Sequence, residues 1–303
     1  MQLDIFEHSR DVMLRNDVLQ SLAQYAAAQA RARCETLAHD YPQDPALAAL
    51  GLLIGAVAAR FDARGQLPAF ADHGTLAQAQ LVLRERLTPV AQSLMAVKPA
   101  QIWLRTFWQD LIARSAHLPY SADTQAQHVA PMLLHIEDWQ GAADAVTHIE
   151  SWRRIPAPLA WMAQARLNLL GLHASWPLLA ELAWLSPQRL EALVQTSADP
   201  ILKRLKNQFE AEFDASNDVT DGASGPCDDL AWFPAWLLTQ RTQLASHLAQ
   251  AQPGMHGAPE QAMRLLVNLL GLEHQGRHQD IVSHRKTLRD LHGGLYAAYM
   301  KTR

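Results

Sequence analysis

A tryptophan followed directly by two arginines is the combination in this sequence best suited to binding a ligand. Trp152 precedes Arg153 and Arg154, between two expected helices. An indole beside guanidinium groups can stack on a partner protein or on a nucleic-acid base. The other tryptophans, from a total of nine, are better explained as large side chains filling space between helices. Trp152, Arg153 and Arg154 are therefore candidate partner-binding residues.

Histidines near the C-terminus have one spacing that would suit a metal. His274 and His278 are four residues apart, so one helix could carry both as zinc ligands. Gly276 lies between them at an expected turn, and no carboxylate or cysteine completes an HExxH-type motif. The acidic segment 214–229 likewise lacks the spacing of a calcium loop. We expect no bound metal and no cofactor.

The C-terminal histidine region is also locally basic. Residues 257–303 contain seven Lys and Arg against four Asp and Glu, a local charge of +3. Such a face could dock an acidic partner, whereas it is weak evidence for nucleic-acid binding. Arg285 and Arg289, on the expected helix 278–300, are further candidate partner-binding residues.

The N-terminal segment carries a short peptide pattern. Gln2, Leu3, Ile5 and Phe6, with Asp4 between them, resemble the peptide by which bacterial replication and repair proteins bind the β sliding clamp. The resemblance implies that Gln2 anchors in a small subsite and that the aliphatic–aromatic pair enters a hydrophobic pocket. A chain terminus ahead of a helix offers the extended segment this binding requires. The alternative, which we favour, is that these apolar residues fold back onto the first helices.

No enzyme signature is present. The sequence contains no GxxxxGK[ST], GxGxxG or GxSxG motif, so a phosphate-binding loop and a nucleophile elbow are not indicated. Glu210 and Glu212 are two residues apart and would face different directions on a helix. An all-helical enzyme with dispersed catalytic residues remains the third interpretation of the sequence.

Composition excludes several classes of protein. The 303 residues are 49% hydrophobic and 18% charged, with a net charge of −4, which excludes disorder for most of the chain. The absence of a basic excess argues against direct nucleic-acid binding. The longest uncharged stretch, 45–59, is shorter than the roughly 20 residues that cross a bilayer. With two distant cysteines and no signal-like N-terminus, we expect a cytoplasmic protein without membrane contact, in a bacterial setting.

Helical periodicity runs through almost the whole chain, and no alternating strand pattern appears. We predict an all-α fold with no sheet, in three parts: a helical array over 1–213, a flexible acidic loop over 214–229, and C-terminal helices over 230–303. The expected helices begin near Ser9 or Asp11 and continue over 27–39, 45–61, 75–95 with a kink or break at Pro89, 99–116, 121–135, 141–150, 158–170, 175–185, 187–194, 199–213, 232–239, 242–251, 259–273 and 278–300.

Internal repetition carries a family resemblance. The segments that begin at Glu137 and Gly171 read alike at an offset of 34 residues, and a third similar segment begins at Gly276. They resemble the second helix of tetratricopeptide repeats, in which a small residue such as Ala142 lies where two helices cross. The resemblance covers about half of the chain, and Trp176 occupies the small position of the second copy. It implies stacked antiparallel helical hairpins, an α-solenoid, with a groove that binds peptides or partner proteins.

These observations give one leading expectation and two alternatives. We expect a non-enzymatic scaffold for protein–protein interaction that binds a peptide or partner protein in a helical groove. The first alternative is a DNA replication or repair accessory recruited to the sliding clamp through residues 2–6. The second is the all-helical enzyme.

Overall fold

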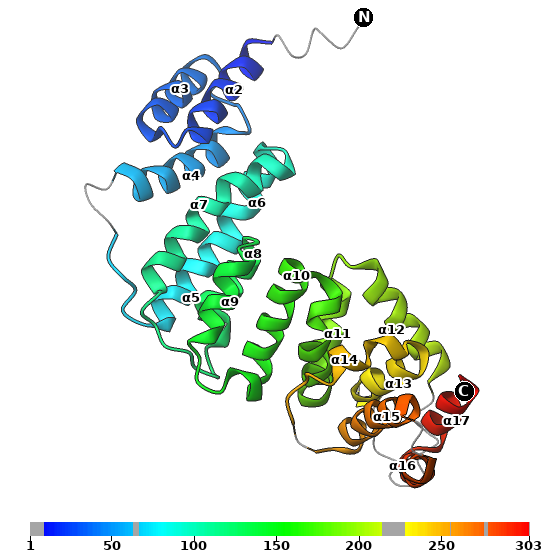
Figure 1. Ribbon diagram of the computed structural model, residues 1–303. Coiled ribbons are helices and arrows are strands. Elements are labelled where there is room, and N and C mark those ends of the chain that lie inside the picture. Colours follow the sequence, from blue (N-terminus) through cyan, green and yellow to red (C-terminus); the bar gives the residue numbers. More distant parts are fainter. Residues whose placement is uncertain (1–8, 63–66, 214–227, 255, 276–277, 303) are drawn as a thin grey trace, which may run out of the picture. The chain divides into compact units, whose positions relative to one another are not determined.

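The computed structural model describes residues 9–62, 67–213, 228–254, 256–275 and 278–302 (Figure 1). Within these ranges the regular structure is helical and contains no strand, so the all-α prediction is confirmed for this part of the chain. None of the described helices is both long and apolar enough to cross a bilayer. The chain divides into two compact units, Met1–Met132 and Leu133–Arg303. Residues 214–227 of the acidic segment lie outside the described residues.

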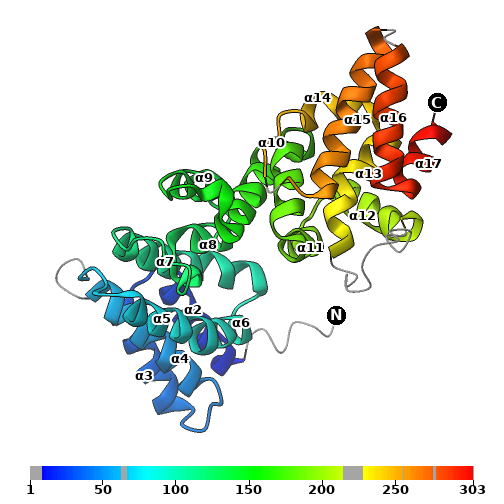
Figure 2. The ribbon, with the colours of Figure 1, turned by 90° about the horizontal axis from the view of Figure 1, so that it is seen from below.

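The first unit is built from helices that pack against their neighbours in sequence, such as α2 on α3 and α3 on α4 (Figures 1 and 2). Its helices are α2 (Arg10–Ala23), α3 (Ala27–Asp40), α4 (Leu47–Val57) with the π-helical turn η1 (Ala58–Asp62), α5 (His73–Leu81), the π-helical turn η2 (Val82–Leu87), α6 (Thr88–Leu94), α7 (Val97–Ser115), the 3₁₀ turn η3 (Gln125–Gln127) and the start of α8 (Val129–His135).

Hydrogen bonds tie α7 to the end of α2 and to the turn that follows it. The indole Nε1 of Trp103, which is 3% exposed, donates to the carbonyl of Leu22 at 2.9 Å. Tyr25 adopts a positive φ of 54° in this turn, and its hydroxyl lies 2.7 Å from Thr106 Oγ1. The turn is therefore held in place by partners on α7 far along the sequence.

The sequence predicted a kink or a break at Pro89. The structure shows that the helix continues through this residue. The chain runs from α5 through the π-helical turn η2 directly into α6. Proline has no N–H for the carbonyl four residues earlier, and its ring collides with that carbonyl in a regular α-helix. The wider π turn just before Pro89 relieves this conflict, and Thr88 Oγ1 donates to the carbonyl of Leu83 at 2.8 Å.

The second unit contains the remaining helices. α10 is contacted by both α9 and α11, and α15 packs on α13 and α16. Its elements are the rest of α8, α9 (Trp139–Thr147), the 3₁₀ turn η4 (Trp152–Arg154), α10 (Pro156–Leu185), α11 (Pro187–Thr196), α12 (Pro200–Glu212), the 3₁₀ turn η6 (Asp228–Trp232), α13 (Phe233–Gln240), the 3₁₀ turn η7 (Thr242–Leu244), α14 (Ala245–Leu248), α15 (Ala258–Gln275), α16 (His278–Leu291) and α17 (Gly293–Lys301).

Aromatic side chains fill the core of the second unit. The ring of Phe209 lies 5.5 Å from that of Phe233 and 5.4 Å from that of Trp236, centroid to centroid, in edge-to-face geometry. Trp176 packs against the same Phe233 at 6.2 Å. Trp176 and Trp236 are both almost fully buried, so for these two tryptophans the expected core role is confirmed.

Two expected helices are interrupted by a histidine whose ring caps the start of the helix that follows it. The prediction of one helix over 121–135 is wrong, because α8 begins only after His128, whose Nδ1 accepts the N–H of Ala130 at 3.2 Å. The prediction over 278–300 is wrong for the same reason. His292 is extended (φ −158°, ψ 106°), and its Nδ1 accepts the N–H of Leu295 at 2.9 Å.

Candidate functional site

The turn that carries the candidate arginines is set by local backbone chemistry. Ser151 adopts a left-handed φ of 54°, which starts the 3₁₀ turn η4. Ile155 is extended, as is favoured before a proline, and Pro156 opens α10 at a helix position that needs no N–H donor. Just before α10, this turn leaves Arg154 exposed and Arg153 partly buried, and the guanidinium of Arg153 lies 5.2 Å from the centroid of the Trp152 ring.

A corner in α10 brings Arg153 to a buried carboxylate. In a straight helix, Arg153 and Glu181 would lie roughly 40 Å apart at 1.5 Å per residue. Gly171, with φ 77° and ψ 177°, turns the second segment of α10 in a new direction. As a result, Nε of Arg153 lies 3.5 Å from Oε2 of Glu181.

Glu181 is nearly enclosed, at 6% exposed. Its Oε1 accepts the backbone N–H of Gln252 at 2.8 Å. Burial raises the pKa of Glu181, and the N–H of Gln252 and the charges of Arg153 and Arg264 oppose this rise without cancelling it. The carboxyl thus links α10 to the loop that follows α14.

A second buried carboxylate holds that loop. Glu260, in the first turn of α15, is 1% exposed and accepts the backbone N–H groups of Gly254 at 3.0 Å and His256 at 2.9 Å. Nε of Arg264 donates to it at 3.0 Å. Burial alone would raise the pKa of Glu260, but these donors outweigh it and lower the pKa. The loop is therefore fixed by an ionised group.

Together these elements enclose a pocket of about 280 Å³ in the second unit. Its polar lining includes both candidate arginines and Glu181, and its apolar lining includes Trp184, Leu185 and Pro253. The full lining is Arg153, Arg154, Glu181, Trp184, Leu185, Gln252, Pro253 and Gly254. We call it the arginine pocket.

The arginine pocket has hydrogen-bond donors left over. The side chain of Arg154 is exposed and has no hydrogen-bond or ion-pair partner among the described residues. Nε1 of Trp184 is buried and has no hydrogen-bond acceptor among the described residues. The guanidinium of Arg264 lies 5.6 Å from the centroid of the Trp184 ring. A buried N–H without a partner costs about 1–3 kcal/mol. This excess of donors suits a ligand that supplies acceptors.

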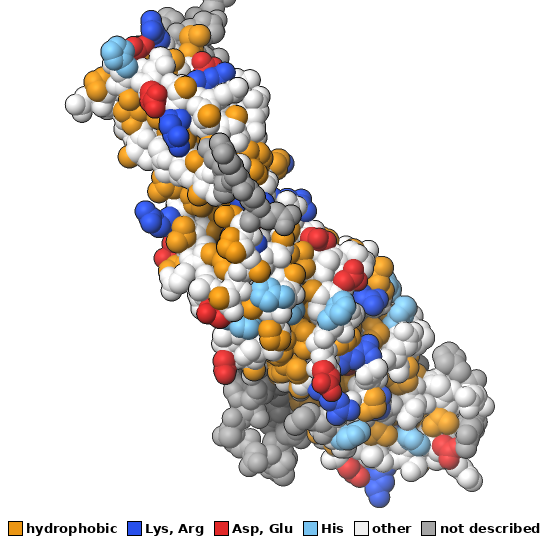
Figure 3. Space-filling model, turned by 90° about the vertical axis from the view of Figure 1, so that its left-hand side faces the viewer, with side chains coloured by type: hydrophobic (Ala, Val, Ile, Leu, Met, Phe, Trp, Pro, Cys, Tyr) orange, Lys and Arg blue, Asp and Glu red, His pale blue; other side chains and the backbone are white. Residues whose placement is uncertain are grey.

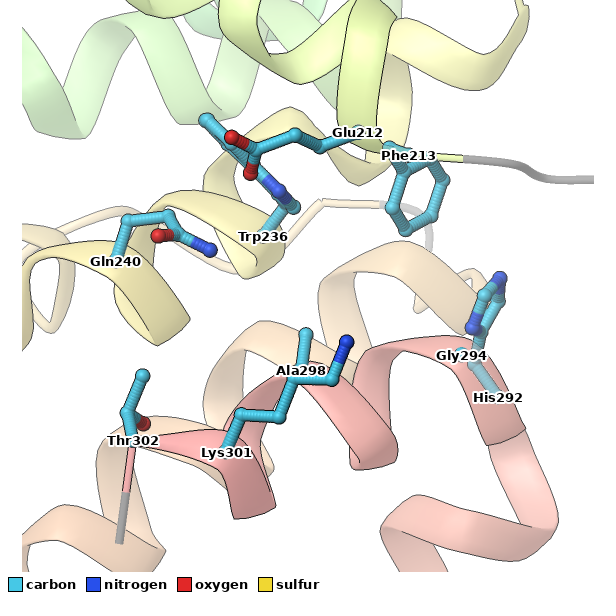
Figure 4. Close-up of a pocket in the computed structure, with 9 residues that line it drawn as sticks. All are labelled: Glu212, Phe213, Trp236, Gln240, His292, Gly294, Ala298, Lys301 and Thr302. Atoms are coloured by element: carbon cyan, nitrogen blue, oxygen red, sulfur yellow. The ribbon is translucent and has the colours of Figure 1, made fainter.

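A larger pocket, of about 440 Å³, lies between α12, α13 and α17 (Figure 4). Figure 4 shows Glu212 and Phe213 on one side, Gln240 beside them, and Lys301 and Ala298 on the opposite side. Phe213 stacks on His292 at 5.1 Å. The full lining of this larger pocket is Glu212, Phe213, Trp236, Gln240, His292, Gly294, Ala298, Lys301 and Thr302. The charged groups here, Glu212 and Lys301, are exposed and of opposite sign, so this pocket favours no single ligand charge.

The other candidate residues do not join the arginine pocket. Arg285 lies within an internal network, with Nη2 3.1 Å from Oε1 of Glu273 and Nε 3.3 Å from the hydroxyl of Tyr299. Tyr299 also donates to Glu273. Arg289, whose side chain is 59% exposed, lies 3.7 Å from Asp290. Arg285 therefore joins α15, α16 and α17, and only Arg289 is largely open to a partner.

Several sequence candidates fall on residues that are not described. Gln2, Leu3, Ile5 and Phe6 lie outside the described residues, as do the side chains of the two histidines considered as zinc ligands. Among the side chains that are described, no group of three His, Cys, Asp or Glu is placed to hold a metal ion.

Sequence reasoning missed both glutamates of the site. Glu181 had a usable signal, because it is the one charged residue between Ser175 and Gln188, a stretch rich in Leu, Ala and Trp. A single charge within such an apolar helix is rarely buried unless it is paired. Glu260 offered no comparable signal, since its partners are backbone N–H groups.

Comparisons with known proteins add no relative from which a role could be transferred. No protein-family model, no curated protein and no solved structure matches this chain.

Proposed function

We propose that this protein is a non-enzymatic scaffold that binds a peptide or partner protein, and that its second unit makes this contact at the arginine pocket. The observation that carries the proposal is the pairing of Arg153 and Arg154 in one pocket. Arg153 is held by Glu181 at 3.5 Å, whereas Arg154 has no partner in the described part of the chain. Arginine and tryptophan together are enriched where proteins bind one another.

The proposal includes tetratricopeptide-like helical hairpins. Helices adjacent in sequence pack on each other in both units, as α2 does on α3 and α15 on α16. This packing supports an arrangement in hairpins. Ala142, at the small position of the repeat pattern, is fully buried in α9. Hairpins stacked in this way would leave a groove for a peptide.

The contacts of Glu181 favour binding over catalysis. A general acid or base needs an oxygen that can exchange a proton with a substrate. One oxygen of Glu181 accepts the N–H of Gln252 and the other faces Arg153. One oxygen is thus held by a hydrogen bond and the other by an ion pair, and both contacts lie in the wall of the pocket.

Charge distribution supports a protein partner rather than nucleic acid. On the face shown in Figure 3, the described Lys and Arg side chains are interspersed with Asp and Glu. Phosphate backbones are bound by fields of basic charge. A cytoplasmic protein of bacterial type is the setting that we assume for the tests.

The test compares three baits in a pull-down from lysate of the native host: the wild-type chain, Arg154→Ala and the control Arg204→Ala. Arg204 is an exposed arginine on α12 that lines neither pocket. A partner identified by mass spectrometry is then purified, and its affinity for each bait is measured. We expect a loss of about 10-fold or more for Arg154→Ala, as for a charge-assisted hydrogen bond, and little change for Arg204→Ala. Equal affinity for all three would contradict the proposal.

A second candidate function rests on the N-terminal peptide. The pattern Gln2, Leu3, Ile5 and Phe6 supports recruitment to the bacterial sliding clamp, in line with its resemblance to clamp-binding peptides. Titration of purified clamp with the wild-type chain, Phe6→Ala and the control Glu7→Ala tests this directly. Binding that is lost only in Phe6→Ala would support it, and no binding by the wild-type chain would refute it.

A further inference from the structure

We propose that the arginine pocket binds the free C-terminal carboxylate of a peptide whose last residue is apolar. The inference rests on the proposed function and names the chemistry of its partner. Three features carry it: the charge around the pocket, its apolar walls and its size.

The charge around the pocket suits a monoanion. Arg153, Arg154 and Arg264 lie in or against it, together with the carboxylates of Glu181 and Glu260. Arg264 and Glu260 pair at 2.9 Å, and Arg153 faces Glu181 at 3.5 Å, which leaves the charge of Arg154 uncompensated. A carboxylate supplies one negative charge and two acceptor oxygens in the plane that a guanidinium recognises. A phosphate dianion would place an extra negative charge beside Glu181.

The apolar walls and the volume of the arginine pocket indicate which kind of residue bears the carboxylate. Trp184, Leu185 and Pro253 line the same pocket as the arginines. At a peptide C-terminus, the carboxylate and an apolar side chain share one Cα, so both can be satisfied together. In an aspartate or glutamate, the carboxylate ends the side chain, and these walls would face polar backbone. The volume of about 280 Å³ is slightly below that of pockets for drug-sized ligands, which fits one terminal residue.

The indole N–H of Trp184 gives a direct readout. We would label the full chain with ¹⁵N-tryptophan, assign the Trp184 signal by its absence in Trp184→Phe, and titrate four probes. N-acetylleucine mimics an apolar C-terminus, and N-acetylleucinamide lacks the carboxylate. N-acetylisoglutamine carries a side-chain carboxylate with an amidated terminus. Inorganic phosphate tests for a general anion site.

We expect the Trp184 signal to shift with N-acetylleucine, saturating in the millimolar range as for one small contact, and not to shift with its amide. Arg154→Gln should weaken this binding about 10-fold or more, with the circular dichroism spectrum unchanged because Arg154 is exposed. Arg204→Ala and Lys301→Ala, the latter in the larger pocket, should leave the affinity within about 2-fold, since neither lines the arginine pocket.

Several outcomes would overturn the inference. These are no shift with N-acetylleucine, an equal shift with the amide, a stronger response to N-acetylisoglutamine or phosphate, or loss of binding in Lys301→Ala. If a partner is captured through Arg154 but N-acetylleucine does not bind, the proposed function stands and this inference falls. If N-acetylleucine binds but no partner depends on Arg154, the pocket is a carboxylate site and the proposed function falls.

Discussion

The backbone N–H of Gln252 donates a hydrogen bond of 2.8 Å to Oε1 of Glu181, across 71 positions of the sequence. The other oxygen of this carboxylate lies 3.5 Å from Nε of Arg153. One buried glutamate therefore joins the turn before α10, the second segment of α10 and the loop after α14. The shape of the arginine pocket depends on this residue as much as on the arginines.

Removing the Glu181 carboxyl should destabilise the second unit. Glu181→Ala leaves the N–H of Gln252 without an acceptor and Arg153 without its counter-charge, and we expect a loss of about 2 kcal/mol. Glu181→Gln keeps an oxygen for Gln252 and should lose about half as much. Urea denaturation measures both, with Asp290→Ala, which breaks an exposed ion pair to Arg289, as a control expected to cost under about 1 kcal/mol. Equal losses for Ala and Gln would show that the hydrogen bond to Gln252 contributes nothing.

Glu181→Gln should also change ligand binding. The neutral amide removes one negative charge from the pocket, so the affinity for N-acetylleucine should rise by a few-fold, about 0.5–1 kcal/mol. The Trp184 indole titration measures it. A fall in affinity would mean that the ionised carboxylate is needed to orient Arg153.

Glu260 should hold the loop in place through its charge. Glu260→Ala removes the acceptor of two backbone N–H groups and of Arg264, and we expect a loss of about 3 kcal/mol. Amide hydrogen exchange at Gly254 and His256 should become faster than in the wild-type protein. Exchange that is unchanged at these two positions would contradict the role assigned to Glu260.

The lowered pKa of Glu260 sets the sign of its pH dependence. A carboxyl whose pKa is lower in the folded state than its ordinary value of 4.5 stabilises the fold above that value, and the stabilisation disappears as the pH falls through the folded pKa. Glu260→Gln should therefore lose less stability than the wild-type protein when the pH is lowered from 6 to 3. The comparison is made by urea denaturation at both pH values.

His128 should make the first unit sensitive to mild acid. Burial, with a smaller effect of the charge of His73, lowers the pKa of His128 from 6.5 to about 4. The unfolded chain therefore binds a proton that the folded chain does not, and stability falls as the pH drops from about 6.5 towards 4. Between pH 7.5 and 5 the loss due to this group should be about 2 kcal/mol.

A substitution that keeps the cap isolates this effect. In His128→Asn, the amide oxygen can still accept the N–H of Ala130 but does not titrate, so much of the difference between pH 7.5 and 5 should disappear. His39→Asn, at an exposed position on α3, should leave the pH dependence as in the wild type. Urea denaturation at both pH values measures it, and an unchanged slope in His128→Asn would contradict the prediction.

Replacing each of two glycines by alanine should change the stability of the protein in opposite directions. Gly171 has φ 77° and ψ 177°, a conformation that only glycine adopts readily, so Gly171→Ala should cost about 2 kcal/mol. A Cβ there would meet no atom within 4 Å, so the loss would come from the backbone. Gly271, within α15, also has open space around it, and Gly271→Ala should gain about 0.5–1 kcal/mol. Thermal or urea denaturation measures both, and equal effects would contradict the strain at Gly171.

The all-helical class could be predicted from the sequence because it depends on short-range properties. Helix propensity and the 3.6-residue spacing of apolar side chains act within a few turns. The predicted break between residues 170 and 175 corresponds to the corner at Gly171. This corner could be predicted because a glycine in a helical pattern is itself a local signal for it. The histidine caps at 128 and 292 were missed because a histidine acts as a cap only when its ring turns back onto the next helix, a geometry that residue type does not encode.

The sequence by itself determined that this protein is helical in its described part and that Trp152, Arg153 and Arg154 stand together at a turn, because these properties follow from neighbouring residues. Only the tertiary structure decided that the arginines share a pocket with Glu181 and with the loop at Gln252. That assembly depends on the direction in which α10 continues after Gly171 and on hydrogen bonds between segments far apart in the chain. Such contacts depend on how the whole unit packs, so they cannot be predicted from a local pattern of residues.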